Sequence, residues 1–304
     1  MKKSNNFLRI ISAVGTFVVI TFLILAFCIT FLDLFPTWRQ LFGKGSAFDN
    51  EGDYVYFLNV GEGDAILIRS NGRYVLIDTG DGETTNIVKA LNKHGVKGLD
   101  ALILTHWHFD HVGAADEILK EFKVLNLVTA KLPVATDELY KPATEINSIA
   151  KENNVSFSLA VNGLAINVGD FKLTVLYYDS SNTEENNRSI VIMANCRDSK
   201  FLLTGDAEEA LENEIIDYGI NIDCDVLKIA HHGSKNSTSD NFLKNSSPEY
   251  AVISVGRENS YGHPNSSVLD KLYYKDIKVL RTDYVGDVVF EVLTDGVELL
   301  SNTD

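Results

Sequence analysis

Residues 104–114 read LTHWHFDHVGA and place three histidines and one aspartate within a short stretch that directly follows an apolar run. Alternate residues of an extended segment project to the same side, so His106 and His108 can bind one metal ion. Asp110 and His111 can then bind a neighbouring ion, because imidazole and carboxylate suit Zn²⁺ and Mn²⁺. A surface loop that happens to be rich in histidine is the alternative, but the spacing favours a metal site.

The segments around this stretch predict an α/β domain with two similar halves. In each half, β-rich segments separated by turns come first and a helix follows, so the pattern favours helices packed outside two facing sheets, an αββα sandwich. The main predicted strands are Val55–Asn59, Ala65–Ser70, Tyr74–Asp78, Ala101–Leu104, Phe171–Tyr177, Ile190–Ala194, Phe201–Thr204, Val226–Ala230, Ala251–Val255, Lys278–Arg281 and Val288–Leu293, the last at a sheet edge. The predicted helices are Thr84–His94, Gly113–Phe122, Glu208–Tyr218 and Ser267–Tyr274.

The N-terminal region carries an uncharged, mostly apolar run at residues 10–32. As a helix it would be about 35 Å long, enough to cross a bilayer as one transmembrane helix. Basic residues within 1–9 favour a cytoplasmic N-terminus. A cleaved signal peptide is the alternative, but no small-x-small cleavage site ends the run. We therefore expect a single-pass anchor in the cell membrane, a tether at 33–52, and an extracellular catalytic domain at 53–304.

Composition fits a globular protein, with 45% hydrophobic and 23% charged residues among 304. The 42 acidic residues outnumber the 27 basic ones and give a net charge of −15. Such a surface repels polyanions, so no stable nonspecific binding of nucleic acid is expected and DNA would need a local basic channel. Outside the apolar run, Cys196 and Cys224 are too few for a disulfide framework, and we expect them to be buried, with one disulfide between them as the alternative.

The stretch HWHFDH fits the His-x-His-x-Asp-His signature of the metallo-β-lactamase superfamily, which this chain resembles over nearly everything after the tether. The motifs LNVGEGDAILI, LIDTG, ENNRSIV, FLLTGD, LKIAHHGS and YGHP resemble, more narrowly, the extracellular hydrolase-like domain of ComEC competence proteins. Phosphorylcholine esterases share parts of this pattern. The resemblance implies a four-layer αββα fold and a metal-dependent hydrolase, and specifies the substrate much less closely.

Further site residues follow from the resemblance. Asp206 is the expected acid that bridges two ions, although a helix N-cap is the alternative. Asp78 is the expected acid that orients a ligand histidine, or else it shapes its turn. Of the adjacent His231 and His232, the latter fits the last metal ligand better because a glycine follows it, and the former would then face the substrate or support the site. Asp64 is expected to be a turn residue.

One departure from the superfamily pattern concerns the first metal. Many members with two ions supply a third histidine between the signature and the bridging acid, and this chain has none from residue 112 to 230. Asn187 is a poor substitute for imidazole. We therefore expect one or two divalent ions, Zn²⁺ or Mn²⁺, with the first held by fewer ligands.

The reaction that we expect is attack by a metal-bound hydroxide on phosphorus or carbonyl carbon. Asp110 is expected to be a catalytic residue as well as a ligand, and His263, in a turn, binds a phosphate oxygen or protonates the leaving group; a plain surface turn is the alternative. The resemblance favours a phosphodiester substrate, such as DNA or a phosphorylated envelope polymer. A lactone or β-lactam hydrolase and a catalytically degenerate binding domain are the other hypotheses.

Overall fold

The computed structural model describes residues 52–83, 87–135 and 138–300. The predicted membrane span at 10–32 and nearly all of the tether lie outside these residues. Within the part of the chain that is described, no helix combines the length and the apolar character that a membrane crossing requires. Residues Glu51–Asp304 form one compact unit.

The first sheet has eight strands in the order β17-β16-β1-β2-β3-β5-β7-β8. Strands β17, β16, β1, β2 and β3 pair antiparallel, whereas β3, β5, β7 and β8 run parallel, as expected where helical crossovers join consecutive strands. The strands are β1 (Asp53–Phe57), β2 (Ile66–Ser70), β3 (Arg73–Ile77), β5 (Ala101–Leu104), β7 (Asn126–Thr129), β8 (Ser156–Leu159), β16 (Val288–Leu293) and β17 (Gly296–Leu300).

The second sheet has seven strands in the order β15-β14-β13-β12-β11-β10-β9. It repeats the plan of the first, because β9 to β12 pair antiparallel and β12 to β15 run parallel. Its strands are β9 (Ala165–Val168), β10 (Phe171–Tyr177), β11 (Val191–Cys196), β12 (Ser199–Leu203), β13 (Val226–Lys228), β14 (Tyr250–Ile253) and β15 (Lys278–Arg281). A short pair, β4 (Gly98–Leu99) and β6 (Lys123–Val124), flanks the first sheet.

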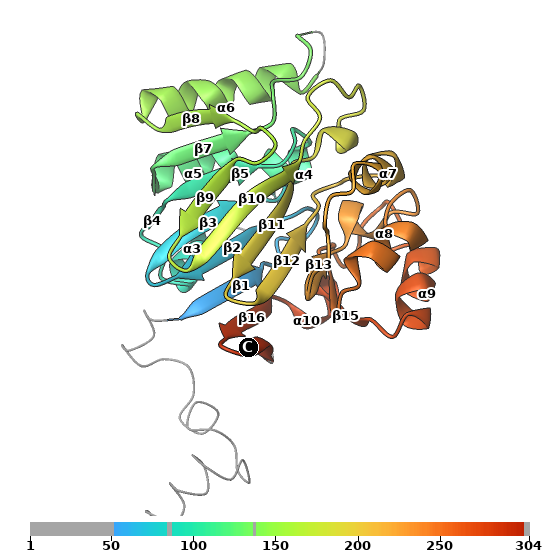
Figure 1. Cartoon of the computed structure of the whole chain (residues 1–304). Coiled ribbons are helices and arrows are strands. Elements are labelled where there is room, and N and C mark those ends of the chain that lie inside the picture. Colours follow the sequence, from blue (N-terminus) through green and yellow to red (C-terminus); the bar gives the residue numbers. More distant parts are fainter. Residues whose placement is uncertain (1–51, 84–86, 136–137, 301–304) are drawn as a thin grey trace, which may run out of the picture. The chain divides into compact units, whose positions relative to one another are not determined.

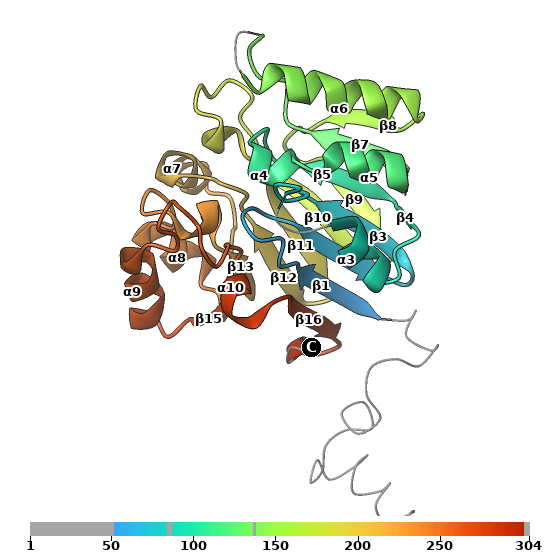
Figure 2. The same ribbon diagram turned by 180° about the vertical axis from the view of Figure 1, so that it is seen from behind.

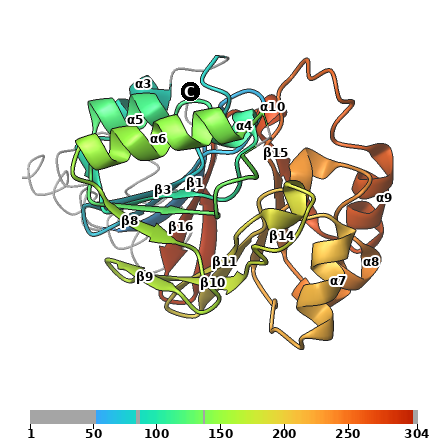
Figure 3. The ribbon, with the colours of Figure 1, turned by 90° about the horizontal axis from the view of Figure 1, so that it is seen from above.

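Helices cover the outer faces of the two sheets, as the views in Figures 1, 2 and 3 show. Those over the first sheet are α3 (Ile87–Lys93), α5 (Ala115–Glu121) and α6 (Tyr140–Glu152), and those over the second are α7 (Glu209–Asp217), α8 (Asp240–Ser246) and α9 (Ser266–Tyr274). Two single turns, α4 (Phe109–Val112) and α10 (Thr282–Val285), and two 3₁₀ turns, η1 (Asn186–Arg188) and η2 (Ala230–Gly233), lie in connections. The predicted mixed α/β arrangement of helices outside two sheets is confirmed.

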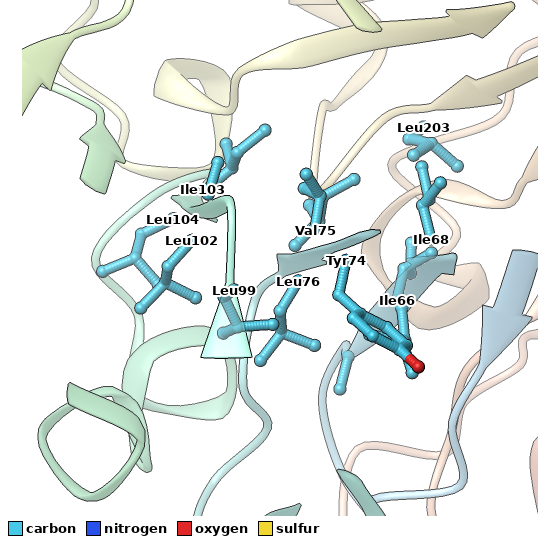
Figure 4. Close-up of a cluster of buried hydrophobic side chains, with 14 of the residues drawn as sticks. Ile66, Ile68, Tyr74, Val75, Leu76, Leu99, Leu102, Ile103, Leu104 and Leu203 are labelled. Atoms are coloured by element: carbon cyan, nitrogen blue, oxygen red, sulfur yellow. The ribbon is translucent and has the colours of Figure 1, made fainter. Parts of the chain in front are cut away.

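The core lies between the sheets and under the helices. Successive residues of a strand point to opposite faces, and Figure 4 shows Val75 and Ile103 on one face with Leu76 and Leu102 on the other. Leu203 of the second sheet lies in the same buried cluster, so side chains of both sheets pack together. Because both faces of the central strands are buried, they read as nearly continuous apolar runs, which is why the sequence revealed them.

The predicted edge position of Val288–Leu293 is wrong. This segment is a strand, but β17, which was not predicted, pairs with it on the outside, and β1 pairs with it on the inside. The segments from β6 to β9 and helices α6 and α8 were not predicted either. Cys196 and Cys224 are buried and free, as expected, so the alternative of a disulfide is excluded.

Candidate metal centre

The predicted site residues come together where strands of both sheets end. His106 and His108 follow β5, Asp78 follows β3, and Asp206 and His232 follow β12 and β13. Because β3 and β5 are parallel, and β12 and β13 are parallel, each pair of strands brings its carboxyl-end loops to one edge of its sheet. The facing sheets thus bring four separate loops to one place, although the residues involved lie far apart in the sequence.

Asp110, His111, Asp206 and His232 form the first cluster, here called the four-residue group, whose ligand atoms all lie within 4.8 Å of one another. His111 Nε2 lies 3.2 Å from Asp206 Oδ1, and His232 Nε2 lies 3.5 Å from the same oxygen. His232 Nε2 also lies 3.2 Å from Asp110 Oδ2. Two imidazole nitrogens and two carboxylates therefore converge on one point, which is the donor set that Zn²⁺ and Mn²⁺ take.

His106, His108 and Asp206 form the second cluster, the three-residue group. His106 Nε2 lies 3.1 Å from His108 Nδ1 and 3.9 Å from Asp206 Oδ2. The two groups thus face opposite oxygens of Asp206, the arrangement expected of a carboxylate that bridges two cations.

The histidines of the four-residue group are oriented from behind. Asp78 Oδ2 accepts a hydrogen bond of 2.8 Å from His111 Nδ1, and the backbone oxygen of Ser254 accepts one of 2.9 Å from His232 Nδ1. Asp78 also accepts bonds from the backbone amide and hydroxyl of Thr105, and so is itself fixed. Such partners fix the tautomer that leaves Nε2 available as a ligand.

Three atoms of the four-residue group are buried without a hydrogen bond, namely His111 Nε2, His232 Nε2 and Asp206 Oδ1. Buried polar atoms are nearly always satisfied, so three orphaned atoms that face one another mark a place for a ligand. A divalent cation satisfies all three, since two are imidazole nitrogens and the third is a carboxylate oxygen. The residues present therefore fit the metal that the signature implies.

The charges of the ion-free cluster agree with this fit. Burial lowers the pKa of His106 well below its ordinary value, and the neighbouring His111 lowers it further, so this imidazole is neutral. Burial alone would lower the pKa of His232, but Asp206 and Asp110 outweigh it and raise the pKa to about 9. The pKa of Asp206 is well below its usual range, because His111 and His232 outweigh the effect of burial. Burial of His111 is likewise outweighed by the neighbouring carboxylates, which raise its pKa, so without an ion the protons on His111 and His232 supply the positive charge that the carboxylates need.

The turn that carries His232 has an uncommon backbone. His231, His232 and Gly233 all have positive φ, at 48°, 52° and 85°. Non-glycine residues in this region carry a cost, and such conformations concentrate at functional sites. Here the turn directs His232 inward, with its side chain 4% exposed, and leaves the side chain of His231 23% exposed.

His231 lies beside the four-residue group but outside it. Its Nε2 is 3.9 Å from Asp206 Oδ2, and its Nδ1 is 3.4 Å from both Glu208 Oε1 and the side-chain nitrogen of Asn186. The geometry therefore favours His232 over His231 as the ligand. Asn187 does not point to an ion with its side-chain oxygen, because this atom accepts a hydrogen bond from the backbone amide of Glu208.

His263 lies next to these residues, with its ring centroid 5.6 Å from that of His231. Its backbone is fixed by Asn259, whose side chain accepts from the His263 amide and donates to the His263 carbonyl. Burial lowers the pKa of the His263 side chain, and its Nδ1 is buried without a hydrogen bond. The turn at YGHP therefore does border the cluster of histidines.

Sequence reasoning missed the part played by Asp64. This residue lies at the end of the turn between β1 and β2, as expected, but it is fully buried and forms an ion pair of 2.9 Å with the buried Lys228. The available signal was the single lysine in the otherwise apolar segment VLKIA, since a lysine is almost never fully buried unless it is paired.

Comparisons with known proteins agree with this geometry. The model of the metallo-β-lactamase superfamily matches residues 58–148. ComE operon protein 3 of Bacillus subtilis is 35% identical over 263 residues, which make up 79% of this chain and 33% of that protein. Competence protein ComA of Neisseria gonorrhoeae is 30% identical over 292 residues, covering 91% of this chain and 39% of that protein. The chain thus spans about a third of the length of these curated relatives.

Among solved structures, Igni18, a metallo hydrolase from Ignicoccus hospitalis, is similar with a TM-score of 0.55 and 16% identity. The similarity covers 78% of this chain and 99% of that one. At this level of identity it shows the shared fold alone.

Proposed function

The chain belongs to the metallo-β-lactamase superfamily, with ComEC-like competence proteins among its relatives, and we propose that it hydrolyses phosphodiester bonds with one or two divalent ions. The observation that carries the proposal is the pair of ligand groups that share Asp206, one on each of its oxygens. When bound, the metal acts as a Lewis acid and activates a water molecule as the nucleophile.

Each residue of the site has a distinct task in this proposal. Asp110, His111, Asp206 and His232 would hold one ion, and His106 and His108, with Asp206, would hold the other. Asp78 would keep His111 in the tautomer that binds metal. Asp110, whose side chain is 30% exposed, is the member of the four-residue group that the substrate can reach.

His263 would bind the substrate. Since burial lowers its pKa, its imidazole is neutral at pH 7 and can donate one N–H to a phosphate oxygen. Its neighbour His231 is partly exposed and lies on the same side of Asp206 as the three-residue group. Together these two rings would border the phosphate of the substrate.

The preference for a phosphodiester rests on the relatives, one of which is named competence protein ComA. DNA and phosphorylated envelope polymers both contain the bond in question. The net charge of −15 opposes nonspecific retention of a long polyanion, so recognition would depend on the site rather than on the general surface.

The test is a panel of substrates with the full chain, namely bis(p-nitrophenyl) phosphate, single-stranded DNA and nitrocefin, each with measured metal content. We expect metal-dependent hydrolysis of the first, and of DNA if it is the polymer recognised. Hydrolysis of nitrocefin alone would favour the β-lactam hydrolase, and tight metal binding without any hydrolysis would favour the degenerate binding domain. Either result would overturn the proposal.

We further propose that residues 10–32 anchor the protein in the cell membrane with the catalytic domain outside. The support is the uncharged run itself and the basic residues that precede it. Protease added to intact cells should then digest the domain. Full protection of the domain, while a known surface protein is digested, would exclude this topology.

A further inference from the structure

A buried ion pair connects the two halves of the fold directly beside the metal centre. Asp64 Oδ2 lies 2.9 Å from Lys228 Nζ, and the two side chains are 1% and 0% exposed. A buried pair is weak evidence for stability, because desolvation of both charges offsets most of their attraction. The role of this pair therefore depends on the loops that Asp64 and Lys228 contact.

The Asp64 end is joined to the loop that carries Asp110. The backbone amide of Asp64 donates to the Asp110 carbonyl at 3.2 Å, and the amide of Gly80 donates to the Asp64 carbonyl at 2.8 Å. A side chain at Gly63 would place its Cβ 1.8 Å from the Asp110 carbonyl oxygen. The turn that ends at Asp64 thus lies directly against the backbone of a candidate ligand, at a distance that only glycine permits.

The Lys228 end is joined to the loops that carry Asp206 and His232. Lys228 is the last residue of β13, four residues before His232, and its carbonyl accepts a hydrogen bond of 2.7 Å from the hydroxyl of Thr204. Thr204 in turn lies two residues before Asp206. A movement of Lys228 would therefore be transmitted to both of these loops.

The free oxygen of the pair faces the site as well. Asp64 Oδ1 lies 3.7 Å from His232 Nδ1, too far for a hydrogen bond, and it has no hydrogen-bond partner. The Nδ1 proton of His232 goes instead to the Ser254 carbonyl. Asp64 thus touches the surroundings of His232 without competing for its proton.

We propose that the Asp64–Lys228 pair is a positioning device that sets the separation between Asp110, from the first half of the fold, and His232, from the second. In this role it determines the affinity of the four-residue group for a divalent ion. The inference rests on the metal-binding role proposed for that group, and it does not depend on which bond the enzyme cleaves. Partners behind the ligands of metal sites typically contribute about 10-fold to 100-fold in affinity.

The experiment compares two double variants of the full chain. Asp64→Asn with Lys228→Met removes both charges of the buried pair and nearly preserves its volume. Asp223→Asn with Lys200→Met makes the same two changes at an exposed pair of the same length, 2.9 Å, which joins β12 to the loop before β13. For each metal-free protein, the midpoint of thermal unfolding and the dissociation constant for Mn²⁺ and for Zn²⁺ are measured.

We expect the buried double variant to fold, because neutral residues of similar size often replace a buried pair without loss of stability. Its dissociation constant for the tightest ion should rise about 10-fold to 100-fold, while that of the exposed double variant stays at the wild-type value. A purely structural role would instead lower the unfolding midpoint and leave the affinity of the folded protein unchanged.

Wild-type affinity in the folded buried double variant would overturn the inference. So would failure of this variant to fold even with saturating metal, because the pair would then be needed for the fold itself. A wild-type chain that binds neither ion would overturn the proposed metal centre, and hydrolysis of nitrocefin alone would overturn only the proposed substrate. The failures are thus distinguishable.

Discussion

The four-residue group and the three-residue group share Asp206 but differ in how their imidazoles are held. In the former, His111 and His232 each donate Nδ1–H to a fixed acceptor and keep Nε2 free. In the latter, His106 Nε2 lies 3.1 Å from His108 Nδ1, so the nitrogens bond each other when no ion is present. An ion must break that bond at the three-residue group, whereas at the four-residue group it takes the place of protons on nitrogens that have no hydrogen-bond partner.

The partners of the Nδ1 atoms add to this difference between the two groups. His106 Nδ1 faces only hydroxyl groups, of Thr105 at 3.2 Å and of Ser189 at 3.5 Å, whereas His111 Nδ1 faces a carboxylate. A carboxylate behind an imidazole raises its basicity and thus strengthens it as a ligand. The comparison teaches that the two halves of one site can have the same kinds of ligand and still differ in preorganisation, so we expect a tight ion and a loose one.

The largest effect should follow from loss of the four-residue group itself. In Asp110→Ala with His111→Ala, we expect the tight ion to be lost and hydrolysis to fall by about 1000-fold or more, since the metal supplies the main chemical activation. Both residues lie on the short turn α4 rather than in a sheet, so circular dichroism should change little. Undiminished hydrolysis in this variant would remove the basis of the comparison.

The next effect should come from the acid behind His111. Asp78 has a φ of 58°, a conformation that asparagine tolerates, so Asp78→Asn retains the shape of the turn. It removes the negative charge that faces His111, and affinity for the tight ion should fall about 10-fold to 100-fold. Metal titration measures this, and Asp223→Asn at an exposed position is the control. Equal affinities in the two variants would mean that the charge of Asp78 does not prepare the site.

From the weaker three-residue group we expect the number of bound metal ions to differ between dialysed protein and protein with added metal. Extensively dialysed protein should keep about one equivalent of metal and gain activity when Mn²⁺ or Zn²⁺ is added, because the loose site has fewer protein ligands. His108→Ala should abolish the gain while keeping the tight ion. If dialysed protein retained two equivalents and added metal left its rate unchanged, a further ligand would complete the site, and His263, whose Nδ1 is buried without a hydrogen bond, would be the next residue to replace.

A smaller effect should appear in the metal-free protein as a function of pH. His232 has a pKa raised to about 9, because Asp206 and Asp110 outweigh its burial. A raised histidine pKa contributes stability that is complete below about pH 6.5 and is lost as the pH rises through about 9. The unfolding midpoint should therefore fall by about a few degrees between pH 6.5 and pH 9.5. In His232→Asn this fall should be smaller. An identical fall would mean that a group other than His232 loses the proton in this pH range.

The sequence predicted the parts of this site that are local in the chain. HWHFDH runs from the end of β5 into α4, so its histidines and aspartate could be placed together from the sequence, and the resemblance to the metallo-β-lactamase superfamily added Asp206 and His232. The contact between Asp64 and Lys228 could not be predicted, because it joins different sheets and no local periodicity reports such a pair. Strand β17 was missed for a different reason, because it pairs with β16, its neighbour in sequence, and the Asp-Gly dipeptide at 295–296 was an available local signal for that hairpin.

Other segments were missed because they lack an apolar pattern. All four residues of β8 are exposed, and β9 has one buried residue, so neither shows the buried run that revealed β5. Only pairing with neighbouring strands makes them part of a sheet. Edge strands are in general less constrained in sequence than central ones, since one side of each has no partner to satisfy.

The smallest effect on metal binding should come from replacement of His231. Comparison with the same replacement at His232 shows which of the two adjacent histidines is the metal ligand. The Nδ1 of His231 is near Glu208 and Asn186, and its Nε2 is 3.9 Å from Asp206. His231 therefore lies beside the two ligand groups and is not itself a ligand in this proposal. His231→Gln should keep the tight ion with nearly wild-type affinity, whereas His232→Gln should lose it, as metal titration of the two purified variants would show. Since both residues have positive φ, glutamine meets the same backbone cost at either position, and a difference between the variants reports ligation. The reverse order of affinities would mean that His231 is the ligand, and it would then replace His232 in the four-residue group.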